Sequence, residues 1–173
     1  MAVAITVGRL VPEVSKLVTL GESIVVFLLY FVVLIVLREF NAEDLAKIHI
    51  QTTARGADIL SDPSKYDPQT KETADHSLPY CLAAAVADRR VTPEQFTEEK
   101  IHDPVIRAQL PKVKVVADPE IEAVFPDKQR CVVRITTTDG RSFEKDLDFP
   151  KGDPRNPMTE EEREVKFDAL AEG

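Results

Sequence analysis

Three side chains near the middle of the chain have the types that proton transfer requires. Asp75 and His76 are neighbours, and Tyr80 follows the histidine by four residues. Histidine titrates near neutral pH and tyrosine donates a proton or a hydrogen bond, so the group suits general acid–base chemistry. The plainer interpretation is that Asp75 and His76 cap a helix while Tyr80 packs in the core. From the residues alone, this plainer interpretation is favoured.

These side chains are positioned by a predicted helix within residues 73–88, TADHSLPYCLAAAVAD. Pro79 lacks a backbone donor and is tolerated only in the first turn, so the helix begins near His76 or Ser77, with one of them as its cap. The aspartate–histidine pair then lies at the helix N-terminus, where the dipole favours a carboxylate. His76 and Tyr80, four residues apart, are expected to share one face.

A second set of candidates lies in the loop of residues 151–157, KGDPRNP. Lys151 and Arg155 are candidates for binding an anionic substrate, since a guanidinium binds a carboxylate through two parallel hydrogen bonds. The plainer interpretation is a rigid turn ahead of a helix. His49, in a predicted strand, and His102, in a predicted loop, are weaker candidates.

The composition is that of one acidic domain with 173 residues and a formal net charge of −8. This charge argues against nucleic acid or an anionic membrane surface as the main partner, and a small anionic substrate would need a local cluster of donors. Cys81 and Cys131 sit in apolar stretches, which predicts buried thiols in a reducing compartment rather than a disulfide. Three dispersed histidines predict no metal site.

The N-terminal segment, residues 1–40, differs from the rest. Residues 24–37, IVVFLLYFVVLIVL, have no polar break, but as a helix they span roughly 21 Å against a hydrocarbon core of roughly 30 Å. Extending the run to residues 17–37 reaches spanning length and encloses Glu22. Three interpretations stay open: a membrane anchor, a buried helix or strand, and a sequence-start artefact of an incomplete gene. In outline, an apolar N-terminal helix precedes the domain.

Residues 41–173 predict a small α+β domain with several helices and an antiparallel hairpin, rather than repeated βαβ units. A hairpin turn is predicted at Thr138-Asp139-Gly140-Arg141, because Asp-Gly readily adopts the positive φ angles of a tight turn. Residues 61–68 predict a loop. The predicted strands are 47–52, 113–116, 131–137 and 142–147, and the predicted helix caps are Asn41, Thr92, Asp103 and Thr159.

Four ordered blocks from Asn41 onwards resemble the C-terminal part of MmgE/PrpD proteins of the 2-methylcitrate dehydratase type. The most recognisable is KETADHSLPY at residues 71–80, which contains all three acid–base candidates. It is followed by VTPEQF at 91–96, IHDPVIRAQLPKVKV at 101–115, and a run from 139 to 167. Four blocks in order are far more specific than one.

The resemblance implies an enzyme in which a large helical domain precedes a smaller α+β domain, with the active site between them. The family includes 2-methylcitrate dehydratase of propionate catabolism, cis-aconitate decarboxylase and an iminodisuccinate epimerase. These enzymes act on small polycarboxylates without a metal or organic cofactor, are typically homodimers, and transfer a proton beside a carboxylate. The resemblance also implies catalytic roles for His76 and Tyr80, with Asp75 next to them.

The chain departs from the family before Asn41, where almost nothing resembles the large helical domain. That domain carries most of the family's catalytic residues, so we expect the chain to be too short for the whole enzyme and inactive alone. The expected partners are a small polycarboxylate and either a chain that supplies the helical domain or a second copy. The expected location is the cytoplasm. The alternative is a membrane-anchored, non-catalytic binding module held by residues 17–37.

Overall fold

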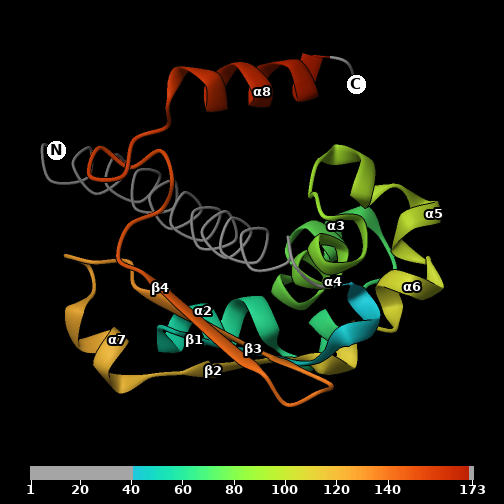
Figure 1. The fold of residues 1–173 in the computed structure, drawn as a ribbon, viewed down its shortest axis with the longest axis horizontal. Coiled ribbons are helices and arrows are strands. Elements are labelled where there is room, and N and C mark those ends of the chain that lie inside the picture. The colour runs from blue at the N-terminus through green and yellow to red at the C-terminus, as the bar shows by residue number, and fades with distance from the viewer. Residues whose placement is uncertain (1–40, 172–173) are drawn as a thin grey trace, which may run out of the picture.

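The computed structural model describes residues 41–171, so the apolar N-terminal segment and its predicted helix lie outside the described residues. A four-stranded mixed sheet forms the centre of the described part (Figure 1). The strands are β1 (Leu45–Thr52), β2 (Val113–Ala117), β3 (Cys131–Thr137) and β4 (Ser142–Leu147), in the order β2-β1-β3-β4. β1 pairs parallel with β2 and antiparallel with β3, and β3 pairs antiparallel with β4.

Alternating side chains give the sheet one buried and one open face. Ile48 and Ile50 of β1 are fully buried, and their cross-strand partners Val133 and Ile135 of β3 are buried with them. His49, between the two isoleucines, points to the opposite face and is half-buried. The predicted alternation in this strand is confirmed.

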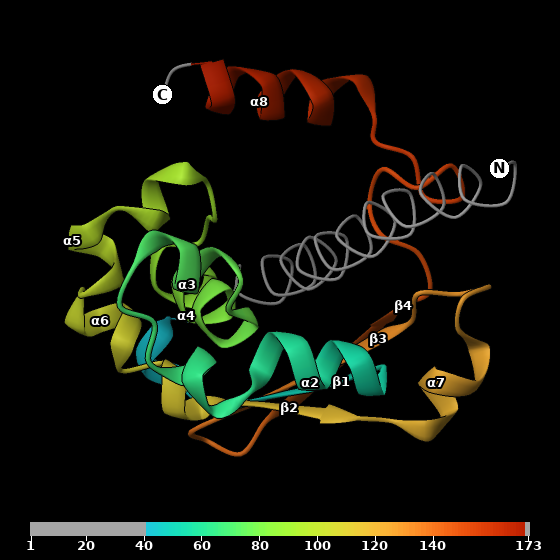
Figure 2. The same ribbon diagram turned by 180° about the vertical axis from the view of Figure 1, so that it is seen from behind.

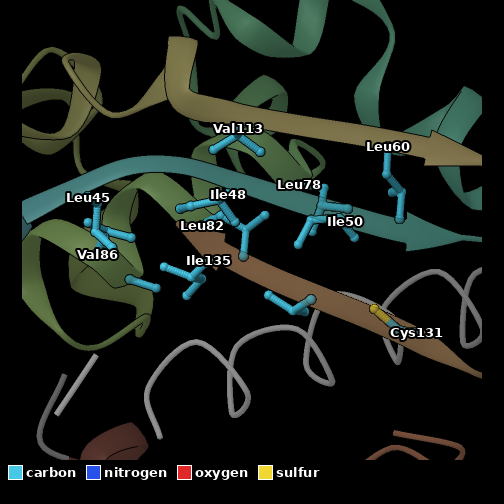
Figure 3. Packing of buried hydrophobic residues seen from close by; sticks show 12 residues of the cluster. Leu45, Ile48, Ile50, Leu60, Leu78, Leu82, Val86, Val113, Cys131 and Ile135 are labelled. Carbon is cyan, nitrogen blue, oxygen red and sulfur yellow. The ribbon is translucent and has the colours of Figure 1, made fainter. Parts of the chain in front are cut away.

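Two helices cover the buried face. They are α2 (Ala54–Ser61) and α4 (Leu78–Asp88), and α2 lies on one side of the strands in both views (Figures 1 and 2). Figure 3 shows the core between these helices and the sheet, with Leu78 and Leu82 of α4 directed at the isoleucines of β1. Every side chain from Leu78 to Val86 is buried, because the other side of α4 contacts a second cluster containing Tyr80, Ile101 and Ile106.

Short helices surround this framework, and most of them begin with a capping side chain or a proline in the first turn. In chain order they are η1 (Ala42–Asp44), η2 (Pro63–Tyr66), α3 (Lys71–Asp75), η3 (Pro93–Phe96), α5 (Glu98–Ile101), α6 (Pro104–Arg107), η4 (Leu110–Lys112) and α7 (Pro119–Val124).

The C-terminal helix α8 (Glu160–Ala171) begins at the predicted capping box. Thr159 N donates to Glu162 Oε2 at 2.7 Å, and Glu162 N donates to Thr159 Oγ1 at 3.2 Å. The helix lies apart from the sheet (Figure 1), and Val165, Phe167 and Leu170 are exposed.

The predicted α+β class, the four strands and the hairpin are confirmed, and Gly140 of the turn has φ +87°. Three features differ from the sequence-based expectations. Helices α2, α3, α5 and α7 were not expected, and part of the predicted loop 61–68 is the 3-10 helix η2. The parallel pairing of β1 with β2 was also not expected, because alternation identifies a strand without identifying its neighbour. Within residues 41–171, none of the helices is both long and apolar enough to cross a membrane.

Candidate functional site

The acid–base candidates lie at a junction between two helices. Helix α3 ends at Asp75, His76 is its C-cap, and Ser77 is the N-cap of α4. Ser77 Oγ accepts a hydrogen bond from Tyr80 N at 3.0 Å and donates one to the carbonyl of Lys65 at 2.5 Å. The predicted start of a helix at this point is confirmed, but Asp75 and His76 belong to the end of α3 and not to the first turn of α4.

Asp75 and His76 are in direct contact. His76 Nδ1 lies 2.5 Å from Asp75 Oδ1 and 3.1 Å from the backbone carbonyl oxygen of Glu72. A carbonyl oxygen only accepts hydrogen bonds, so Nδ1 is the donor and carries the ring proton. In the neutral imidazole, Nε2 is then the proton acceptor.

The side chain that carries this acceptor nitrogen is largely exposed. The His76 side chain is 66 % exposed and the Asp75 side chain 31 % exposed. Among residues 41–171 the structure gives Nε2 no hydrogen-bond partner. Lys71 Nζ lies 3.4 Å from Asp75 Oδ2 across one turn of α3, which supplies a positive charge behind the carboxylate. The arrangement is that of an exposed imidazole held through its Nδ1.

Tyr80 lies in the interior instead. Its side chain is fully buried, its hydroxyl donates to the carbonyl of Gln95 at 2.6 Å, and its ring centroid lies 5.8 Å from that of Phe96. Burial raises the pKa of Tyr80 well above its usual value, so the phenol stays protonated at neutral pH. The structure therefore brings Asp75 and His76 together but does not place Tyr80 on a helix face shared with His76.

A polar network behind Tyr80 was not anticipated from the sequence. Gln95 is fully buried, its Nε2 donates to Asp88 Oδ2 at 3.0 Å, and its Oε1 accepts from Thr92 N at 2.9 Å. Lys100 Nζ lies 2.8 Å from the same carboxylate oxygen. The Thr-x-x-Gln spacing from Thr92 to Gln95 is a capping-box signature that could have identified this glutamine. The network fixes the carbonyl that holds the Tyr80 hydroxyl.

Lys151 and Arg155 each have an acidic partner. Lys151 Nζ lies 2.9 Å from Glu162 Oε2. Arg155 donates from Nε and Nη2 to the two oxygens of Asp153, both at 2.9 Å, and its guanidinium lies 4.0 Å from the ring centroid of Phe149. These hydrogen bonds lower the pKa of Asp153 to about 2. The two cations are not brought together with His76 by any contact that the structure records.

The remaining candidates are placed as the sequence indicated. Cys81 and Cys131 are buried free thiols, and burial, with the Asp75 charge second, raises the pKa of Cys81 to about 12. His49 lies on the open face of β1, and His102 is the exposed C-cap of α5. In the part of the chain that the structure describes, no group of His, Cys, Asp and Glu side chains is arranged to hold a metal ion.

The fold and the junction together define an α+β domain that presents an aspartate-oriented histidine at its surface. The chain belongs to the MmgE/PrpD family, because the family model described as "MmgE/PrpD C-terminal domain" matches residues 33–173. Cis-aconitate decarboxylases of Mus musculus and Homo sapiens are each 32% identical to it over 104 residues, which are 60% of this chain. The matched stretch is 21% of each relative, so the chain spans about a fifth of their length.

Proposed function

We propose that this chain supplies a proton-accepting side chain to a lyase that acts on a small polycarboxylate. The observation that carries the proposal is the tautomer of His76, whose Nδ1 is held by Asp75 and the Glu72 carbonyl while the side chain is largely exposed. A general base needs a defined tautomer and an accessible side chain, and both features of His76 support the proposal. Family membership and the two decarboxylase relatives support the lyase class.

In a dehydration, His76 Nε2 would take a proton from a carbon beside a carboxylate. The electron pair of that C–H bond forms the new C–C double bond, and the C–O bond breaks at the neighbouring carbon. The leaving hydroxide takes up a proton and departs as water. In a decarboxylation, the C–C bond to a carboxylate breaks instead, CO₂ leaves, and imidazolium returns a proton to the carbon. One histidine serves either reaction in opposite protonation states.

Tyr80 belongs to the proposal as the proton donor. Its raised pKa keeps the phenol protonated, which suits a donor and not a base. The hydroxyl must leave the Gln95 carbonyl before it can reach a substrate, because the side chain is fully buried. The proposal therefore includes a rearrangement at the start of α4 when the site is completed.

Lys151 and Arg155 belong to the proposal as carboxylate-binding residues. An incoming substrate has to compete with Glu162 for Lys151 and with Asp153 for Arg155. Lys151 makes a single ion pair, whereas Arg155 is held by a bidentate pair and by the carbonyl of Asp127 at 2.8 Å. Lys151 can therefore turn towards a substrate by breaking fewer interactions than Arg155.

The specific substrate we propose is 2-methylcitrate, with cis-aconitate as the second candidate because the two relatives are named for it. We further propose that a chain carrying the family's helical domain, or a second copy, completes the site in the cytoplasm. No metal or organic cofactor takes part in the proposed reaction.

The test measures turnover of both compounds by the 173-residue chain, alone and co-expressed with a chain that supplies the family's helical domain. We expect no turnover by the chain alone and turnover of one of the two compounds by the pair. Robust conversion of 2-methylcitrate by the chain alone would contradict the proposal. A stable complex that converts neither compound would favour a binding module without catalysis.

A further inference from the structure

The open face of the sheet carries a row of positive charge. In the register of the sheet, His49 of β1 lies between Lys114 of β2 and Arg134 of β3, and side chains at paired positions point to the same face. Lys47, two residues before His49, points to that face as well. We call these four residues the cationic row. Its location is notable because the whole chain has a net charge of −8.

Two members of the cationic row have no acidic partner in the described part of the chain. Arg134 pairs with Glu144 of β4 through Nε at 2.7 Å, but among residues 41–171 the structure gives Lys47 and Lys114 no ion pair. The pKa of His49 is lowered, first by burial and then by the positive charges of Lys47, Lys114 and Arg134. The second cause reflects the same excess of positive charge. Protonation of His49 would place like charges at paired positions of neighbouring strands, because His49 lies opposite both Lys114 and Arg134, and such pairs destabilise a sheet. An anionic partner would remove this repulsion.

The side chains of the cationic row stand side by side across three strands, whereas small ligands bind in concave sites, so we take a macromolecular surface as the partner. Next to the cationic row, Gln51 pairs with Val116 on one side and Val132 on the other, and both valines are half-exposed. The face therefore offers positive charge beside a narrow apolar strip.

Helix α8 carries the complementary pattern. Glu161, Glu164 and Asp168 are spaced by three and four residues, so they lie on one side of the helix, with Val165 next to them at 64 % exposure. We call these three residues the acidic stripe, and in the described part of the chain the structure gives them no ion pair. The stripe is about 10 Å long at about 1.5 Å per residue. Lys114 and Arg134 lie two strands apart, and two spacings of about 4.8 Å separate them by about the same distance.

We propose that the open face of the sheet binds the acidic stripe of α8 from a second copy of this chain. Glu161, Glu164 and Asp168 then face the cationic row, and Val165 packs against Val116 and Val132. The sheet face and α8 are different surfaces of one chain, so the contact is heterologous: one copy supplies the row and the other supplies the stripe.

The test is sedimentation analysis of the full 173-residue chain over a concentration series, at about 0.1 M and about 1 M NaCl, where the Debye length falls from about 10 Å to about 3 Å. We expect self-association at low salt that weakens at high salt. A chain that is monomeric at every concentration would overturn the proposal.

Charge reversal identifies the two surfaces. Lys114→Glu and Glu164→Lys should each weaken association by about tenfold or more, because each places like charges together. A mixture of the two variants should associate again, since the reversed row of one meets the reversed stripe of the other. Lys145→Glu is the matched control, because Lys145 is exposed on β4 but pairs with the buried Val133 and so points to the other face. Asp58→Lys on α2 is the control for the acidic reversal.

Three outcomes would overturn the assignment of these surfaces: association that survives both reversals, equal loss in the Lys145→Glu control, or no recovery on mixing. Melting curves of each variant separate loss of folding from loss of association. Lowering the pH from about 8 to about 6 provides a second readout. Carboxylates over His49 favour its protonated form against Lys47, Lys114 and Arg134, so association should strengthen as the pH falls.

Discussion

Asp75 Oδ1 lies 2.5 Å from His76 Nδ1, at the point where one helix ends and the next begins. This contact and the Glu72 carbonyl determine which imidazole nitrogen carries the proton. The break between α3 and α4 leaves His76 outside both helices and exposed, while Tyr80 in the first turn of α4 turns inward. The same short sequence therefore supplies one exposed imidazole and one buried phenol.

The first prediction concerns the His76 tautomer. At a pH where the imidazole is neutral, ¹⁵N chemical shifts of the ring should show the proton on Nδ1, because both partners of this nitrogen are acceptors. Asp75→Leu removes the shorter of the two contacts and should shift the ring towards the Nε2–H form. His102, the exposed C-cap of α5, is the internal reference. A wild-type His76 with the proton on Nε2 would show that the Asp75 contact does not orient the ring.

The second prediction separates structure from catalysis at Tyr80. Tyr80→Phe leaves the Gln95 carbonyl without its donor in the interior, which should lower the free energy of unfolding by about 1–3 kcal/mol. Urea denaturation at neutral pH measures the change. An unchanged midpoint would mean that the buried hydrogen bond does not stabilise the fold.

The third prediction is a pH dependence that arises from Asp153. Hydrogen bonds from Arg155 lower the folded-state pKa of this carboxyl from 3.8 to about 2. The ionised form therefore stabilises the fold above the unfolded-state value, and the contribution is lost as the pH falls towards 2. Asp153→Asn should destabilise the protein at pH 7, and its urea midpoint should approach that of the wild type as the pH is lowered through this range. A difference that stays constant with pH would contradict the assignment.

The fourth prediction is that neither cysteine reacts in the folded protein. Both thiols are buried, and burial raises the pKa of Cys81 to about 12, so thiolate is scarce at pH 8. Ellman's reagent should label no thiol in buffer and two thiols after unfolding in urea. Rapid labelling of the native protein would show that the first turn of α4 or the start of β3 opens readily.

Local patterns in the sequence predicted most of the sheet. The four strands follow from alternation and from the Asp139-Gly140 turn, and α8 follows from its capping box. Helix α7 carried the same Asp-Pro signal at Asp118-Pro119 that identified α6 at Asp103-Pro104. Helix α2 gave a weaker signal, since Gly56 lies inside it and lowers helix propensity.

The sequence identifies the residue types of the candidate site, but it does not reveal which side chains are buried or which groups they contact. The sequence 75–80 identifies a cap followed by a proline in the first turn, and Ser77 fills that role. It does not reveal that α3 ends one residue before His76, because the break depends on the Ser77 contact with the Lys65 carbonyl, a residue distant in sequence. Partners such as Gln95 for Tyr80 and Glu162 for Lys151 likewise depend on tertiary packing.

The most direct test of the central claim is the turnover number of the reconstituted pair with His76→Gln in this chain. If His76 is the general base, the substitution should lower turnover about 10²- to 10⁴-fold while the complex still forms. His102→Gln should leave turnover unchanged, since that imidazole lies at the end of α5. Equal turnover by the wild type and His76→Gln would contradict the account.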